Sequence, residues 1–165
     1  MQLDAEAASR LFEAEIELES RELARLLELL EDEQRVLTQH EDDLLLGLAA
    51  QKAHRIEALA RLEQRRHGFL REQGFSADGE GMLAWLTQHP QFEAAERGWH
   101  RIQALAQAAR EINDINGGLI DAQMQRFHAR LAFLGAAASN DPAYGPYTPD
   151  GYAAAAAPQH SFGEA

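Results

Sequence analysis

The chain has 165 residues, of which 45% are hydrophobic and 25% charged, a balance that suits one domain with a core of its own. It has no cysteine, which excludes disulfides and thiolate chemistry, and no apolar run long enough to span a membrane. A net charge of −12 disfavours nucleic acid and anionic membrane surfaces as partners. The acidic N-terminus does not resemble a secretory signal, so the expected localisation is cytoplasmic.

The first predicted element is a long helix from Leu3 to about Thr38. An apolar residue recurs every seven positions along it, as in helices that pair side by side. At 1.5 Å per residue the helix would be roughly 54 Å long, which is typical of an elongated bundle. The repeat consists of Ile16, Leu23, Leu30, Leu37 and Leu44. The expected pairs one turn apart are Glu6–Arg10, Glu17–Arg21 and Glu31–Arg35.

A polar, acidic segment from Thr38 to Asp43 predicts a tight turn into a second helix that runs to about Gln73 and ends at Gly74. Because the leucine repeat continues to Leu44, one unbroken helix is the alternative. Residues 1–45 carry a net charge of −10 and residues 46–75 a net charge of +3. These opposite charges favour an antiparallel hairpin over residues 1–75, with exposed ion pairs that set its register more than its stability.

A connector follows over residues 76–90. Asp78-Gly79-Glu80-Gly81 is typical of a loop, and the apolar residues from Met82 to Leu86 predict a short helix that ends before Pro90. A third long helix is expected from about Phe92 to Ala138, within a segment 91–138, and loosened at Gly98 and Gly117–Gly118. The predicted fold is therefore all-α: an elongated antiparallel bundle of three long helices with a short connecting helix, forming one domain over residues 1–138.

The last segment, residues 139–165, has a different composition. It holds four of the five prolines and all three tyrosines, and it has no amphipathic pattern. This predicts a mobile tail without a core. The three aromatic residues favour a short docking motif, although an inert tail is the alternative.

Motifs of catalysis and cofactor binding are missing from the sequence. It contains no His-Glu-x-x-His, no phosphate-binding loop, no nucleophile elbow and no dinucleotide fingerprint. Glu63 and His67 lie one turn apart, as do His54 and Glu57, but such pairs are far more often solvated surface pairs than metal ligands. We therefore predict no enzyme, no cofactor and no metal site.

The third helix carries a broad apolar face that includes two amides, Asn113 and Asn116. A buried amide costs free energy unless its donors and acceptors are paired, so these two residues need partners. Gly117 and Gly118 follow at once, and each should weaken a helix interior by about 1 kcal/mol relative to alanine. A core helix with a polar residue that fixes its register is one interpretation. The apolar members of the face are Ile102, Leu105, Ala109, Ile112, Leu119, Ile120, Met124, Phe127, Leu131 and Leu134.

Two motifs give the sequence a family resemblance. The run Asn113-x-x-Asn116-Gly117-x-Leu119-Ile120 follows an alanine-rich helix, and Tyr144-Gly145-x-x-x-x-x-Gly151 lies in the tail. Together they resemble the C-terminal part of the FlgN family, the flagellar export chaperones for the hook–filament junction proteins. The sequence departs from the family pattern in the second glycine, Gly118, and in a tail that continues with two more tyrosines, Tyr147 and Tyr152.

The resemblance implies a cytoplasmic chaperone that binds hook-associated proteins of the FlgK and FlgL type by their terminal helices. It further implies delivery to the flagellar type III export gate, where Tyr144 and Gly145 would dock on the gate protein FlhA. The expected division places Ile112, Asn116 and Leu119 mostly in the core and Met124, Phe127 and Leu131 mostly against the partner. Two alternatives are a homodimeric coiled-coil scaffold and a helical-bundle enzyme or metal protein. The predicted cargo-binding residues are Asn113, Asn116, Gly117, Leu119, Ile120, Met124, Phe127 and Leu131.

Overall fold

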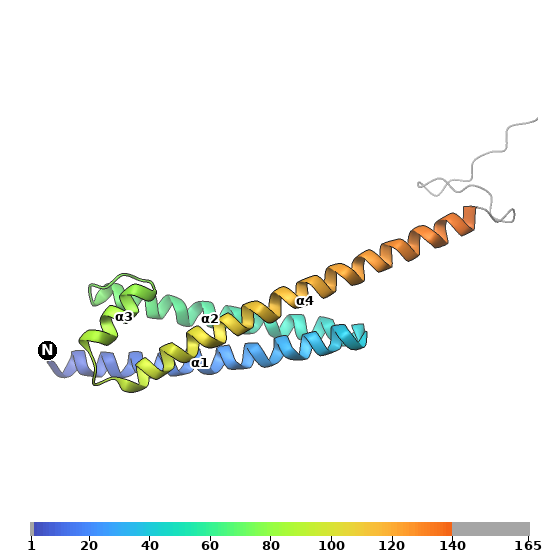
Figure 1. The fold of residues 1–165 in the computed structure, drawn as a ribbon. Coiled ribbons are helices and arrows are strands. Elements are labelled where there is room, and N and C mark those ends of the chain that lie inside the picture. The colour runs from blue at the N-terminus through green and yellow to red at the C-terminus, as the bar shows by residue number, and fades with distance from the viewer. Residues whose placement is uncertain (1, 140–165) are drawn as a thin grey trace, which may run out of the picture. The chain divides into compact units, whose positions relative to one another are not determined.

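The computed structural model describes residues 2–139, and every regular element in that range is a helix (Figure 1). The chain divides into two units after Ile120, so the last helix belongs to both. The all-α prediction with three long helices and one short helix is confirmed. The elements are α1 (Gln2–Gln39), the 3-10 turn η1 (Asp42–Leu44), α2 (Leu45–Glu72), α3 (Gly79–Gln88) and α4 (Glu93–Ser139).

A turn separates α1 from α2, so the prediction of a break at residues 38–43 is confirmed and the unbroken helix is wrong. The backbone of His40 is left-handed, with φ of 59°. The amide of Glu41 donates to the carbonyl of Val36 at 3.1 Å, the bond that closes a helix of the Schellman type. The end of α2 repeats this arrangement around Gly74, whose φ is 82°, and Phe75 N donates to Leu70 O at 2.8 Å.

Within residues 1–120 the three long helices run up, down and up. Helices α1 and α2 are antiparallel, since Glu33 near the end of α1 pairs with Lys52 near the start of α2, and the earlier Glu19 pairs with the later Arg66. Helix α4 runs parallel to α1, since Ala95 lies against Glu13 and Asn116 lies against Leu30. Each long helix is therefore antiparallel to the long helix next to it in sequence, as predicted.

The largest cluster of buried residues lies where α3 covers the hairpin. Phe12 stacks on Phe69 with ring centroids 3.9 Å apart, and Trp85 meets both rings edge-on. Trp85, from the short helix α3, is fully buried. This aromatic cluster fixes the position from which α4 begins. Its buried members are Phe12, Ile16, Leu70, Met82, Trp85, Leu86, Phe92, Ala95, Trp99 and Ile102.

The start of α3 is capped, so Gly79 to Gly81 belong to its first turn and are not the loop that the sequence predicted. The carboxylate of Asp78 accepts a hydrogen bond from the amide of Gly81 at 2.8 Å, and the hydroxyl of Ser76 donates to it at 2.8 Å. These two bonds favour the charged form and lower the pKa of Asp78. Gly81 is required here, because a Cβ would lie 1.8 Å from the carbonyl oxygen of Ser76.

Two smaller expectations are corrected. Helix α4 is continuous through Gly98, where the glycine allows close packing: a Cβ would lie 2.7 Å from Ile16 Cγ2. The helix also runs without interruption through Gly117 and Gly118. Of the three predicted pairs on α1, Glu6–Arg10 and Glu17–Arg21 form, at 2.9 and 3.1 Å, but Arg35 pairs with Asp32 instead of Glu31.

Candidate functional site

One stripe of α4 packs against the hairpin from the start of the helix to Asn116. Its members cover an arc of about 100° at 3.6 residues per turn. Small residues occupy several of its positions, which brings α4 close to α1 at Gly98. The buried members of the stripe are Ala95, Gly98, Trp99, Ile102, Ala109 and Asn116.

Asn116 ties the three long helices together and is 1% exposed. Its Nδ2 donates to the carbonyl of Leu30 and to the carboxylate of Glu33, both at 2.9 Å. The same carboxylate accepts from Nζ of Lys52 on α2 at 2.6 Å. The residue therefore anchors α4 at the point where the buried part of the stripe ends.

Asn113 does not share this role. Its side chain is exposed, and the sequence had put both amides on one apolar face while expecting only Asn116 in the core. Three residues turn the helix by about 300°, which leaves Asn113 roughly 60° away from Asn116. It therefore lies in line with the buried Ala95, about five turns earlier on the same stripe, so the helix face alone does not account for its exposure.

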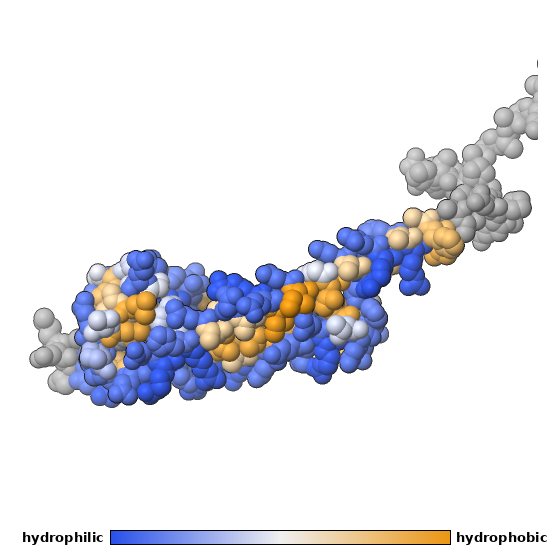
Figure 2. Space-filling view, viewed as in Figure 1, coloured by the Kyte–Doolittle hydropathy of each residue, from blue (hydrophilic) through white to orange (hydrophobic). Residues whose placement is uncertain are grey.

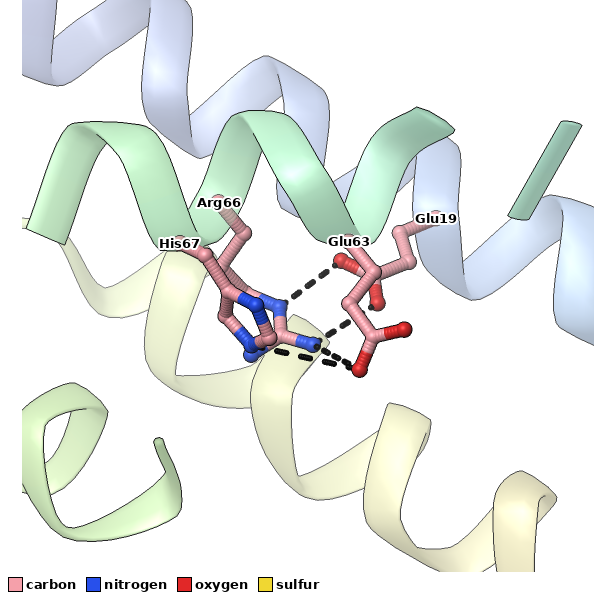
Figure 3. A network of polar contacts seen from close by, with 4 residues as sticks. All are labelled: Glu19, Glu63, Arg66 and His67. Atoms are coloured by element: carbon pink, nitrogen blue, oxygen red, sulfur yellow. Dashed lines mark hydrogen bonds and ion pairs between the residues drawn. The ribbon is translucent and has the colours of Figure 1, made fainter. Parts of the chain in front are cut away.

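A second polar group joins α1 and α2 under α4, and Figure 3 shows its four side chains. Nε and Nη2 of Arg66 donate to the two carboxylate oxygens of Glu19 at 3.0 and 3.2 Å, with both residues buried. The guanidinium also lies 4.9 Å from the ring centroid of Trp99, a cation–π contact. The expectation that hairpin pairs are exposed is therefore wrong for this pair.

The remaining side chains in Figure 3 do not favour a metal site. His67 Nε2 lies 3.9 Å from Glu63 Oε1, and the same oxygen lies 3.8 Å from Nη2 of Arg66. Glu63 is therefore engaged by two cationic or polar neighbours. Within the described range of the chain, no group of three or more histidine or acidic side chains is placed to hold a metal ion.

Beyond Asn116 the same stripe becomes exposed. Its apolar residues follow one another at intervals of four and three, the spacing of a coiled-coil seam, and span an arc of about 80°. They are large, and none is less than 40% exposed. We call these five residues the distal seam: Ile120 (40% exposed), Met124 (50%), Phe127 (56%), Leu131 (49%) and Leu134 (61%).

Ile112 and Leu119, which the sequence placed mostly in the core, are half-buried. Ile112 packs against the cluster formed by Leu26, Leu30 and Ala109. Ile112 and Leu119 thus border the stripe near its buried end, before the exposed distal seam begins. Met124, Phe127 and Leu131, the residues expected to face a partner, all lie in the exposed part.

Gly117 and Gly118 lie between the anchor and the distal seam. Both are exposed, and a Cβ at either would meet no described atom within 4 Å. No packing contact in the described residues therefore requires glycine at these positions. Since each glycine costs about 1 kcal/mol of helix stability relative to alanine, the pair weakens this turn of α4.

A family model described as FlgN protein matches residues 5–152. The chain belongs to the FlgN family. It is accordingly a flagellar export chaperone of the FlgN type, from a family of chaperones that is not known for enzymatic activity. Neither the curated proteins nor the solved structures include a significant match to the chain.

This FlgN-family chain has other apolar surfaces besides the distal seam. A groove of about 600 Å³ lies between α1, α2 and α4, with Leu26, Ile56 and Ala106 among its lining residues. Figure 2 shows an apolar band along α4 within residues 1–120. Ile115 contributes to the exposed apolar surface of this part at 52% exposure. No helix in the described residues is both long and apolar enough to cross a membrane.

The structure shows residues around the stripe that the motifs did not indicate. Glu33 and Lys52 hold the anchor, and Glu19 is the buried partner of Arg66. The opposite charges of the two halves of the hairpin were visible in the sequence, but its spacing did not identify which charged residues are buried. Tyr144 and Gly145, the predicted gate-docking residues, lie outside the described residues, although the family match includes them.

Proposed function

We propose that this FlgN-family protein acts in the cytoplasm and binds hook-associated proteins of the FlgK and FlgL type through the distal seam. The bound segment is a terminal amphipathic helix of the cargo. The observation that supports this proposal best is the exposure of five large apolar side chains at coiled-coil spacing, on a stripe that is buried elsewhere in the same helix. Helices of this kind commonly recognise an amphipathic partner helix.

The chemistry of the distal seam favours an adaptable interface. Met124 is unbranched and polarizable, so it fits an irregular partner surface, while Phe127 supplies a large apolar contact area. Asn113, exposed one turn before the anchor, has amide groups available to a partner backbone. Gly117 lies three residues before Ile120 and so continues the heptad spacing of the seam. These features extend the proposed cargo surface from residue 113 to residue 134.

A pair of phenylalanines allows a controlled test. Phe127 is on the seam, whereas Phe133 is 74% exposed and lies roughly 140° around the helix from the centre of the seam. We expect Phe127→Ala to weaken the binding of a terminal-helix peptide from a FlgK-type protein about tenfold or more. Phe133→Ala should leave the affinity unchanged. Isothermal titration calorimetry on both variants measures the difference.

Two results would contradict the proposal. Equal losses for Phe127→Ala and Phe133→Ala would show that the seam has no special role. If light scattering finds a dimer that the peptide does not dissociate, and Phe127→Ala makes it monomeric, the seam pairs with a second copy. The protein would then be the homodimeric coiled-coil scaffold that the heptad spacing also allows.

For delivery we propose that the tail docks on the export gate protein FlhA through Tyr144 and Gly145. The support is the family match, which extends to residue 152 and thus beyond both residues. A chain cut after Ser139 should keep its affinity for the cargo peptide and fail to support cargo export. Tyr144→Ala should cause part of that loss, with Tyr147→Ala and Tyr152→Ala as controls. Loss of cargo binding on truncation would contradict the separation of the two roles.

A further inference from the structure

We propose that Gly117 and Gly118 form a hinge in α4 that allows the distal seam to reorient about the Asn116 anchor when cargo binds. The part of this inference that concerns binding rests on the proposed function, whereas the hinge itself does not. It follows from three features of the described residues: open space at both glycines, a fixed point immediately before them, and a division of the chain shortly after them.

The first feature is the contrast between these glycines and others in the same unit. At Gly98 a Cβ would lie 2.7 Å from Ile16, and at Gly81 it would lie 1.8 Å from Ser76. Those two glycines are explained by close packing. Gly117 and Gly118 have open space where a Cβ would be, as the single helical glycines Gly47 and Gly68 also do, so what sets them apart is that two glycines share one turn and add their conformational freedom there.

The second feature is the position of the anchor. Asn116 is buried and bonded to Leu30 and Glu33, so the backbone immediately before the glycines is held by α1. The third feature is that the unit containing the anchor ends at Ile120, two residues after the glycines. A soft turn placed directly after a fixed residue confines any bending to one point of α4.

A close contact with a partner backbone is the competing explanation, and it accounts for only one glycine. Gly117 continues the spacing of the seam and could face the partner. Gly118 lies about 160° from the centre of the seam, so the same partner helix would not reach it. A hinge requires both residues, because two consecutive glycines free four backbone dihedral angles in one turn.

Spin labels test the hinge without cargo, and the chain has no native cysteine to remove. Labels at Arg101→Cys and Ala129→Cys, both exposed and on opposite sides of the glycines, would be about 42 Å apart along a straight helix. Arg10→Cys with Thr38→Cys gives a control of equal separation within α1. We expect a broader distance distribution for the α4 pair, narrowed to the width of the control by Gly117→Ala with Gly118→Ala. An α4 distribution as narrow as the control, or one that the alanines leave broad, would overturn the hinge.

Affinity for the FlgK-type peptide tests whether the hinge contributes to cargo binding. The double alanine variant should raise Tm by a few degrees and weaken binding about fivefold or more. Gly68→Ala is the matched control: Gly68 lies inside α2 in similarly open space, so the change should raise Tm without altering affinity. Unchanged or tighter binding by the double variant would overturn the hinge's role in binding. If Gly117→Ala alone gives the whole loss of affinity, Gly117 contacts the partner backbone and the hinge has no role in binding. If no variant binds the peptide, the proposed function fails and the label distances still decide the hinge.

Discussion

The two parts of α4 on either side of Gly117–Gly118 carry one apolar stripe, which is buried before the glycines and exposed after them. Before the glycines, Trp99 and Ile102 are 6% exposed; after them, Phe127 and Leu131 are 56% and 49% exposed. The distal residues are no less apolar than the proximal ones, so hydrophobicity does not explain the difference. Within residues 1–120 helix α1 covers the proximal part, whereas the described residues after Ile120 contain no second helix. An apolar stripe of this kind thus predicts packing without telling which chain supplies the partner.

The largest expected effect compares Phe12 in the aromatic cluster with Phe127 on the seam. Phe12 is 1% exposed and stacked on Phe69, so Phe12→Ala should cost about 3–5 kcal/mol of unfolding free energy. Phe127→Ala should change it by less than about 0.5 kcal/mol, because surface substitutions rarely do more. Urea unfolding followed by circular dichroism measures both. A loss above about 2 kcal/mol for Phe127→Ala would mean that the distal seam is part of the folded core.

A smaller loss of unfolding free energy is expected when a buried arginine is compared with an exposed one. Arg66→Gln leaves the buried Glu19 with one hydrogen bond in place of two, and it removes the cation over Trp99. We expect a loss of about 2–3 kcal/mol, below the ~3–5 kcal/mol for removing a buried partner outright. Arg61→Gln is the control, since Arg61 pairs with Glu57 on its own helix at the exposed surface and should cost at most ~0.5 kcal/mol.

Salt separates these two arginines further. Exposed pairs are screened over a distance of about 3 Å at 1 M salt, whereas buried pairs are screened much less. The loss caused by Arg66→Gln should therefore be nearly the same in about 0.05 M and about 1 M sodium chloride, measured by urea unfolding. A loss that disappears at high salt would show that Glu19 and Arg66 pair at the surface, as the sequence first suggested.

Most of the fold could be predicted from the sequence, because heptad spacing and turn residues are local signals. Ile16, Leu30 and Leu37 were read from their repeat and are buried, and Gly74 ends α2 as its chemistry requires. Burial of polar groups could not be predicted in the same way, since it depends on which helices meet. Glu19 and Glu33 lie three residues after Ile16 and Leu30, on the face of the repeat, but nothing local shows which side chains pair with them.

In the predicted site, too, the sequence does not show which of two polar residues is buried. Asn113 and Asn116 have the same side chain and a similar place in the motif, but only Asn116 is buried and bonded to α1. At 3.6 residues per turn both residues fall within the arc of the buried stripe, so periodicity does not decide which of them is buried. The family resemblance identified the motif as a unit, and the structure divides it into an anchor and a surface.

The smallest expected change in stability tests whether Asn116 anchors α4 while Asn113 lies on the surface. Asn116→Ala removes the two hydrogen bonds to Leu30 and Glu33, although Glu33 keeps Lys52 as a partner, so we expect a loss of about 1–2 kcal/mol of unfolding free energy. Asn113→Ala removes an exposed amide of the same size and should be neutral or slightly stabilising, because alanine has the higher helix propensity. Hydrogen exchange adds a local readout: the amides of α4 between residues 109 and 116 should lose protection in Asn116→Ala and keep it in Asn113→Ala. If Asn113→Ala destabilises the protein as much as Asn116→Ala, both amides anchor α4, and the candidate cargo surface begins after the motif and not within it.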